Sequence, residues 1–416
     1  MRKLLKNQYV VSLATKVFIV LLGLLISIFI NRYLGPSLKG EYSYILNIIN
    51  ILVLILNLGI YQSYPFYKRS DEEECKSKFF SIVIIQFLLY LTIAIILSIA
   101  LKKIEYTLML TLTPIMILRR QLNFIGLVEN INKRNLLNIG NQIFYTLLLF
   151  LIYTLMLTNL YYVFIAMYLK DIIIIIRIIY KYNLKLQLKN LDAKLASSAI
   201  KFGIFPMLAA LLTTANYSLD VIILKHFMNY REIGYYTVGV GLANKVWLIS
   251  DAFKEVLFSK TAKKDSIFDV KLSLKINLYI SIVLIIFIIV FGQAVIQTLY
   301  GTEYLPAYSV TSVIFIGLIP MIFFKLINPL FVANGRQKES FIYLLIAVTF
   351  NIGMNLVLIP KMGIVGAALA SVVSYTICGG LFLLSFIRSF SLKWKEVFIF
   401  EKSELEIIKN KLLSKK

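Results

Sequence analysis

About twelve apolar stretches, each the length of a membrane-spanning helix, divide the chain at regular intervals. Crossing about 30 Å of hydrocarbon takes about 20 mostly apolar residues. Nothing in the hydrocarbon can hydrogen-bond with the backbone, so such stretches must form helices, which satisfy their own backbone groups. A hydrophobic fraction of 59% also excludes a soluble domain of ordinary composition. We therefore predict an all-α integral membrane protein, with spans at residues 10–30, 42–60, 79–101, 106–128, 136–157, 161–179, 202–224, 235–257, 274–296, 308–332, 341–359 and 364–387.

Lys and Arg are distributed unevenly among the segments between the spans. The short basic N-terminal segment precedes a span without a small-residue cleavage site, so we expect this span to be retained and the N-terminus to be cytosolic. An even number of spans returns the C-terminus to the cytosol. In this topology the cytosolic segments hold 28 of the 44 Lys and Arg residues and the outer loops hold 7, as the positive-inside rule requires. The net charge of +23 thus indicates topology and attraction to the anionic inner leaflet, and no nucleic-acid partner.

The two halves of the chain resemble each other weakly. Residues 123–134 at the end of the fourth span correspond to residues 328–339 at the end of the tenth, and each segment ends an apolar helix in a polar, basic turn. Such a repeat predicts two six-helix lobes related by an axis along the membrane normal. Chance similarity between apolar helices is the alternative. The expected organisation is an N-lobe at 1–180, an amphipathic linker on the inner leaflet at 181–201, a C-lobe at 202–388 and a basic, solvated cytosolic tail at 389–416.

Several cations lie deep inside the apolar stretches. A Lys or Arg at the centre of a span costs about 2.5–3.5 kcal/mol, so such residues are rare unless they face a bundle interior or a water-filled cavity. Arg120 and Lys325 occupy equivalent positions in the two halves, and we expect them to face each other across a central cationic cavity. Arg offers planar bidentate donors and Lys a mobile point charge, which suits a phosphate or pyrophosphate group. The candidate anion-binding residues are Arg120, Lys325, Arg119, Lys16 and Lys245; internal pairing with carboxylates is the alternative.

Acidic residues inside the spans are fewer, and we assign a role to one of them. Asp220 lies a few residues from the outer end of the seventh span, where it would either bind a coupling ion, H⁺ or Na⁺, or cap a polar outer vestibule. Asp251 is expected to form a structural cluster with neighbouring charged residues at helical spacing. Lys170 and Asp171 are adjacent in sequence, so they should point in different directions and form no obvious pair.

The sequence shows no motif of a hydrolytic machine. It has no Gly-rich nucleotide loop and no metal-ligand spacing, and its only histidine, His226, lies in an outer turn. We therefore expect no cofactor, no metal and no enzymatic activity. Cys75 and Cys378 lie on different sides of the predicted membrane plan, so we expect no disulfide between them.

Short motifs recur around the ends of the spans. They are NRYLGP at 31–36 with GEY at 40–42, LNLGI at 56–60, DVIIL at 220–224 with IGYY at 233–236, ANGR at 333–336 and GIVGAA at 363–368. In these motifs, and over nearly the whole span region, the chain resembles bacterial O-antigen and capsule repeat-unit flippases of the multidrug/oligosaccharidyl-lipid/polysaccharide exporter superfamily. None of the motifs specifies the substrate.

The resemblance implies a central cationic cavity that opens alternately to the two sides and carries undecaprenyl-pyrophosphate-linked oligosaccharide, with ion-gradient coupling through Asp220. It also implies a monomer in the bacterial cytoplasmic (inner) membrane, whose other partners are membrane lipids and polysaccharide-assembly proteins. Two alternatives belong to the same superfamily. A multidrug exporter is expected to carry more buried carboxylates, and a lipid II flippase typically has additional helices. A membrane-bound glycan polymerase would need a long outer loop, which this sequence lacks.

Overall fold

The computed structural model describes residues 8–69, 74–157, 159–187, 192–261, 266–402, 404 and 406, without the side chains of residues 8–17 and 258–260. Within these ranges the backbone consists of helices joined by turns and contains no strand. The chain forms two compact units, Met1–Ala215 and Asn216–Lys416. The predicted all-α class is confirmed.

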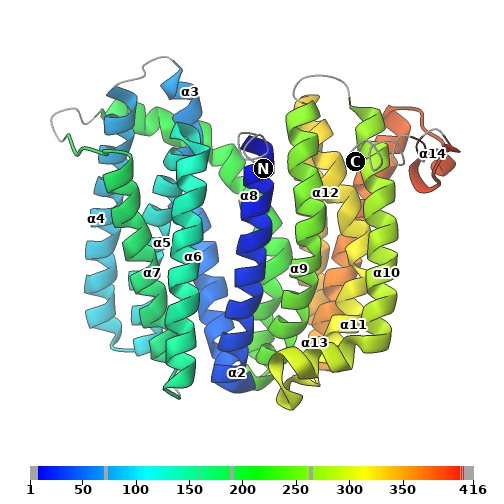
Figure 1. Cartoon of the computed structure of the whole chain (residues 1–416), viewed down its shortest axis with the longest axis horizontal. Coiled ribbons are helices and arrows are strands. Elements are labelled where there is room, and N and C mark those ends of the chain that lie inside the picture. The colour runs from blue at the N-terminus through cyan, green and yellow to red at the C-terminus, as the bar shows by residue number, and fades with distance from the viewer. Residues whose placement is uncertain are drawn as a thin grey trace. The chain divides into compact units, whose positions relative to one another are not determined.

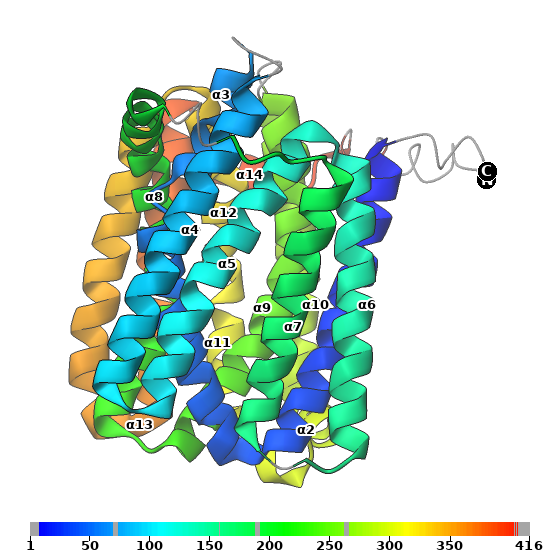
Figure 2. The ribbon, with the colours of Figure 1, turned by 90° about the vertical axis from the view of Figure 1, so that its left-hand side faces the viewer.

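Unit 1 is built around helix α5. Its elements are α2 (Gln8–Leu56), the 3-10 turn η1 (Ile60–Ser63), α3 (Tyr64–Lys68), α4 (Glu74–Leu101), α5 (Ile104–Glu129), α6 (Ile131–Thr154), α7 (Leu160–Lys181) and the first part of α8 (Ala193–Phe227) (Figures 1 and 2). Helix α5 packs against α2, α4 and α7. It contributes Leu112 to one buried apolar cluster and Leu122 to a second one. Position 119 lies between these two buried anchors.

Unit 2 is built around helix α12. Its elements are the rest of α8, α9 (Tyr230–Thr261), α10 (Ile267–Tyr300), the 3-10 turn η3 (Thr302–Tyr304), α11 (Ala307–Ile316), α12 (Leu318–Ala333), α13 (Gln337–Ser389) and α14 (Trp394–Phe398). Helix α12 packs against α9, α10 and α13. Large side chains such as Phe331 and Phe382 are completely buried there, with their ring centroids 5.5 Å apart.

The two longest helices each contain a sharp break. At about 1.5 Å per residue, the 49 residues of α2 would reach about 74 Å if straight, more than twice the thickness of the hydrocarbon. The chain breaks at Gly35, where φ is 64°, and α13 breaks at Gly363, where φ is 58°. Glycine enters this left-handed region without steric cost. Each long helix thus divides into two arms of membrane length, at the positions where the sequence predicted loops between spans.

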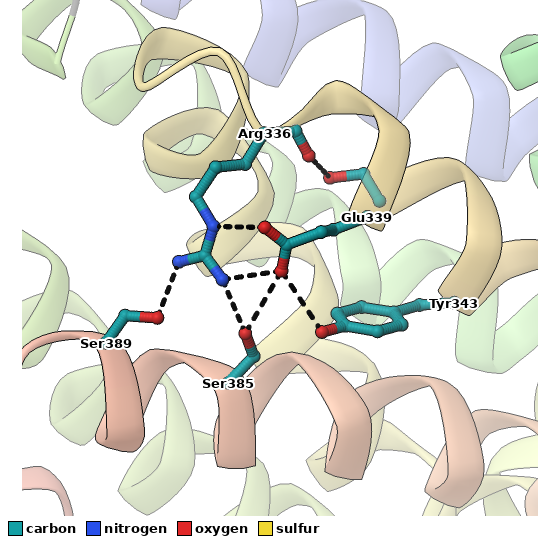
Figure 3. A network of polar contacts seen from close by, with 6 residues as sticks. Arg336, Glu339, Tyr343, Ser385 and Ser389 are labelled. Carbon is teal, nitrogen blue, oxygen red and sulfur yellow. Dashed lines mark hydrogen bonds and ion pairs between the residues drawn. The ribbon is translucent and has the colours of Figure 1, made fainter.

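A polar network joins the two ends of α13 (Figure 3). Arg336, at the start of α13, donates hydrogen bonds to Ser385 and Ser389 near its other end, each at 2.7 Å. The same guanidinium binds Glu339 in the first turn, and Tyr343 donates to that carboxylate. Because residues 336 and 389 meet, the two arms of α13 must lie side by side.

Helices occupy all twelve predicted spans, but they are not equally apolar. Among the described residues, six helices are long and apolar enough to cross a membrane, namely α4, α6, α8, α10, α13 and residues 18–56 of α2; α11 and α12, bent by 47° relative to each other, make a seventh if counted as one span. Helices α5, α7 and α9 are long enough but carry several charged residues. The candidate site residues Arg119 and Arg120 lie on α5, and Lys245 lies on α9.

Two predicted connecting segments have defined structure. Part of the expected linker at 181–201 is the start of α8, a helix that continues into unit 2, and residues 188–191 lie outside the described ones. The tail was expected to be solvated; most of its described side chains are exposed or half-buried, but part of it packs against α10. Helix α14 packs on α10, and the side chain of Glu404 is buried. Charged partners on α10, Lys271 and Lys275, hold this part of the tail in place.

Candidate functional site

Unit 1 contains a cationic pocket of about 650 Å³. Helix α5 provides most of its wall, because at about 3.6 residues per turn its five lining residues fall within one arc of roughly 140° around the helix. The turn η1 and the first turns of α6 complete it. The lining residues are Tyr61, Gln62, Arg119, Arg120, Asn123, Phe124, Leu127 and Arg134. Three guanidinium groups and no carboxylate thus line the pocket among the described residues.

A tight turn after α2 brings η1 to this pocket. The side-chain oxygen of Asn57 accepts a hydrogen bond from the backbone N–H of Gly59 at 2.8 Å, and its amide donates to the carbonyl of Val53. Gly59 has a φ of 66°, and a Cβ there would lie 2.2 Å from the carbonyl oxygen of Gly203 in α8. Only glycine fits both the backbone angle and the close approach. The LNLGI motif therefore has a structural role, which is to direct Tyr61 toward α5.

Arg120 is held by an aromatic side chain and not by a carboxylate. Its Nε donates to the Tyr61 hydroxyl at 3.2 Å, and its guanidinium carbon lies 5.9 Å from the centroid of the Tyr61 ring. Phe124 supports that ring edge-on at 4.9 Å, and Gln62 donates to the same hydroxyl. A guanidinium placed in this way keeps its charge and its Nη donors for a ligand.

Arg134 reaches the pocket because a single residue, Asn130, separates α5 from α6. The Asn130 side chain caps α6 by accepting a hydrogen bond from the backbone N–H of Lys133 at 2.9 Å. Arg134 Nε donates to the Asn123 side-chain oxygen at 2.7 Å, and Asn138 binds Asn123 from the next turn of α6. No described carboxylate lies within 4.0 Å of Arg134. Burial lowers the pKa of this guanidinium, which still stays charged at neutral pH.

Arg119 differs from its neighbour because it faces a buried carboxylate. Its Nε lies 3.2 Å from Oδ1 of Asp171 on α7, and Lys170 Nζ lies 3.4 Å from the same oxygen. The expectation that Lys170 and Asp171 form no pair is wrong, because the flexible Lys stem bends back to the adjacent residue. The Asp171 side chain is 0% exposed, whereas that of Arg119 is 30% exposed.

The other predicted cations do not belong to this pocket as it is described. Lys325 on α12 is held by both oxygens of Asp251 on α9, at 2.8 and 2.9 Å, so the carboxylate alternative applies to it. Asp251 on α9 thus pairs with a residue of α12, in addition to the cluster predicted within α9. Lys245 on α9 lies 3.4 Å from the carbonyl of Gly241. The side chain of Lys16 lies outside the described ones, and the facing of Arg120 and Lys325 stays a prediction.

Asp220 lies in a second polar site, inside unit 2. Its side chain accepts hydrogen bonds from Tyr236 on α9 at 2.6 Å, and from Asn355 and Ser371 on the two arms of α13. Asp220 is 1% exposed, and no described Lys or Arg lies within 4.0 Å of it. The side-chain oxygen of Asn355 and the side-chain nitrogen of Asn351 are buried without a hydrogen-bond partner in the described chain. Keeping such a buried carboxylate ionised without a positive counter-charge is costly.

Sequence reasoning missed six of the eight lining residues, the apolar Phe124 and Leu127 and four polar ones, Tyr61, Gln62, Asn123 and Arg134. The spacing of Asn123 from Arg119 was a usable signal, because residues four apart share a helix face. The predicted topology places Arg134 in a cytosolic loop between the fourth and fifth spans, and its contact with α5 depends on the short turn between the helices.

Family models match two parts of the chain. The model described as "Polysaccharide biosynthesis protein" matches residues 29–309, and the one described as "Lipid II flippase MurJ" matches residues 248–412. The uncharacterized membrane protein MJ1068 of Methanocaldococcus jannaschii is 27% identical over 196 residues, which are 44% of this chain. The match spans only 38% of that relative's length.

Solved structures share the fold. A lipid II flippase MurJ in an inward closed conformation has a TM-score of 0.74 at 18% identity, covering 96% of this chain and 90% of that one. An inward-facing multidrug resistance MATE family transporter of the MOP superfamily has a TM-score of 0.72 at 15% identity, covering 92% and 98%. A MOP superfamily transporter from Pyrococcus furiosus has a TM-score of 0.60 at 14% identity, covering 92% and 96%. The chain shares the fold of the MOP superfamily transporters. The polysaccharide biosynthesis model matches more than half of the residues of this chain, which therefore belongs to the polysaccharide biosynthesis protein family.

Proposed function

We propose that this protein is a flippase that moves undecaprenyl-pyrophosphate-linked oligosaccharide repeat units across the bacterial cytoplasmic membrane for O-antigen or capsule assembly. The observation that carries the proposal is the pair Arg120 and Arg134, which line one pocket and have no carboxylate partner within the described chain. Family membership supports a glycan-linked substrate. Pyrophosphate is the part of that substrate that such a pocket would recognise.

The chemistry of the pocket suits a pyrophosphate group. Guanidinium groups bind phosphate oxygens with paired N–H donors, and these bonds strengthen where water is partly excluded. In the proposal Arg119, Arg120 and Arg134 hold the pyrophosphate, while the polyprenyl chain remains in lipid. Lys16, Lys245 and Lys325 would meet the anion in other stages of the cycle, and Lys325 would first have to release Asp251.

The proposed cycle is alternating access coupled to an ion gradient at Asp220. A proton, or a sodium ion bound by carboxylate, amide and hydroxyl oxygens, would supply the missing positive charge. Asp220, on α8, accepts hydrogen bonds from groups of α9 and of both arms of α13, so ion binding there would bias how these helices pack.

A second candidate is a lipid II flippase, which the match of the MurJ family model to residues 248–412 favours. Both substrates would place a pyrophosphate in the pocket, so only the glycan distinguishes them. The Arg-lined pocket disfavours the multidrug alternative, because cationic drugs require carboxylates.

The test is export of surface polysaccharide in cells that lack their own repeat-unit flippase. Wild type should restore export, and Arg120→Gln and Arg134→Gln should each reduce it at least tenfold at equal membrane expression. Arg177→Gln is the matched control, because Arg177 is an exposed arginine of α7 that does not line the pocket. Full export by the Arg120→Gln/Arg134→Gln double variant would overturn the role of the pocket.

Two further measurements separate the remaining claims. In vesicles, flipping of repeat units should exceed flipping of lipid II; the reverse preference would favour the second candidate. Asp220→Asn should remove the dependence of flipping on a proton or sodium gradient and leave pyrophosphate binding unchanged. Gradient-dependent flipping by that variant would refute the coupling role.

A further inference from the structure

We propose that Asp171 is a positioning residue that sets the affinity of the pocket by competing with the bound anion for Arg119. The inference rests on the proposed function, because it assumes that the pocket takes a pyrophosphate group. It assigns a role to an acidic residue that lies behind the pocket and not in its lining.

Arg119 is shared between the pocket and the buried carboxylate. Its guanidinium lines the pocket and is 30% exposed, yet its Nε lies 3.2 Å from Asp171 Oδ1. The pair is poorly oriented: within the described chain neither oxygen of Asp171 accepts a well-formed hydrogen bond, and Arg119 Nε donates none. A charge pair without aligned hydrogen bonds is held less firmly than a bidentate one. A bound anion would therefore have to compete with Asp171 for Arg119, and for no other guanidinium of the pocket is a carboxylate competitor described.

Lys170 lowers the energetic cost of moving Arg119 from Asp171 to an anion, because Arg119 and Lys170 share the Asp171 carboxylate. Its Nζ lies 3.4 Å from Asp171 Oδ1 and 4.6 Å from the centroid of the Tyr145 ring, in contact with both. When Arg119 turns to an anion, Asp171 keeps Lys170 as its partner. An unpaired buried charge, which would be strongly unfavourable, is thus avoided.

Competition of this kind suits a carrier, which must release what it binds. Affinity differences between related complexes arise mostly from the dissociation rate. Three guanidinium groups without a competitor would hold pyrophosphate for a long time. When Asp171 pairs with Arg119 again, the pyrophosphate dissociates sooner, and its affinity for the pocket is lower. Arg120 and Arg134, which have no described carboxylate partner, would supply the constant part of the attraction.

The test is binding of inorganic pyrophosphate to the full-length protein in lipid nanodiscs, measured by calorimetry. Asp171→Asn should bind on the order of tenfold more tightly than wild type. Lys170→Gln should bind more weakly, because Asp171 then has only Arg119. Both effects should vanish in an Arg119→Gln background, which a merely structural role of Asp171 does not predict. Asp171→Glu, which keeps the charge, should restore affinity toward that of wild type.

Flipping kinetics provide an independent readout. In Asp171→Asn both KM and kcat should fall, because tighter binding slows release. Unchanged or weaker pyrophosphate binding by folded Asp171→Asn, with binding still lost in Arg120→Gln, would overturn the inference and leave the proposed function standing. Absence of pyrophosphate binding by wild type would overturn both. If Asp171→Asn does not fold, the Lys170→Gln comparison with and without Arg119→Gln decides the question by the same criterion.

Discussion

The buried ion pair between Lys275 on α10 and Glu404 in the tail is expected to be the strongest single attachment of the C-terminal segment. Lys275 Nζ donates to both carboxylate oxygens of Glu404, at 2.6 and 2.8 Å. The two side chains are 0% and 2% exposed. We predict that Glu404→Gln strongly destabilises unit 2, because it leaves a buried ammonium group without its counter-ion.

The magnitude follows from the distances and the burial. At an effective dielectric constant of about 20, unit charges 2.6 Å apart attract by about 6 kcal/mol. Much of this gain offsets the cost of removing both ions from water, and loss of one partner of a buried pair costs about 3–5 kcal/mol. The Phe400 ring, 5.9 Å from Nζ, offers only a cation–π attraction in place of the carboxylate.

The assay is reversible unfolding of the purified protein in mixed micelles, followed by tryptophan fluorescence. Glu404→Gln should lower the free energy of unfolding by about 3–5 kcal/mol. Lys275→Met combined with Glu404→Leu should recover most of the loss, because apolar side chains replace a buried pair at little cost. Glu396→Gln is the matched control: it breaks the partly exposed pair with Lys271 and should have a much smaller effect. Equal effects of Glu404→Gln and Glu396→Gln would refute the reasoning.

Three further predictions concern other parts of the chain. Gly59→Ala should prevent accumulation of folded protein, since φ is 66° and the new Cβ would lie 2.2 Å from the Gly203 carbonyl oxygen. Gly241→Ala is the control, because nothing lies within 4 Å of the new Cβ, and it should keep or raise the thermal midpoint. Equal behaviour of the two variants would show that the Gly59 turn is dispensable. The hydrogen bond from Arg336 lowers the pKa of Glu339 from its ordinary value of 4.5, so this carboxylate stabilises the fold above that value and loses its effect as the pH falls through the lowered pKa. The thermal midpoint of Glu339→Gln should therefore be lower at pH 7 and fall less steeply toward pH 3 than that of wild type; parallel curves would contradict this. Lys325→Gln should reduce polysaccharide export less than Arg120→Gln does, because Asp251 already neutralises Lys325; a larger loss with Lys325→Gln would show that Lys325 is the main anion ligand.

Much of the architecture could be read from the order of residues. The spans were predicted because apolar length is a local property, and the helices lie where the hydropathy is high. The breaks at Gly35 and Gly363 fall between predicted spans, where glycine permits a positive φ. Arg119 and Arg120 were recognised as unusual because a charge inside an apolar helix is costly wherever that helix is placed.

The partners of these charges could not be read in the same way. Arg119 meets Asp171, and Lys325 meets Asp251, although about 50 and about 75 residues separate the members of each pair. In the sequence both cations were candidate anion ligands, with internal pairing with carboxylates as the alternative, and the structure distinguishes them from Arg120, whose partner is the Tyr61 hydroxyl.

By itself the sequence determined the helical class, the positions of the spans and the helices that carry buried charge, because each depends on neighbouring residues and on the cost of leaving polar groups in hydrocarbon. Only the tertiary structure decided which cations stay available to a ligand. That outcome depends on how each helix is rotated and on what the side chains of packed helices can reach. Arg134 reaches the pocket because only one residue separates α5 from α6. Glu404, in the C-terminal tail, forms a buried ion pair with Lys275 on α10.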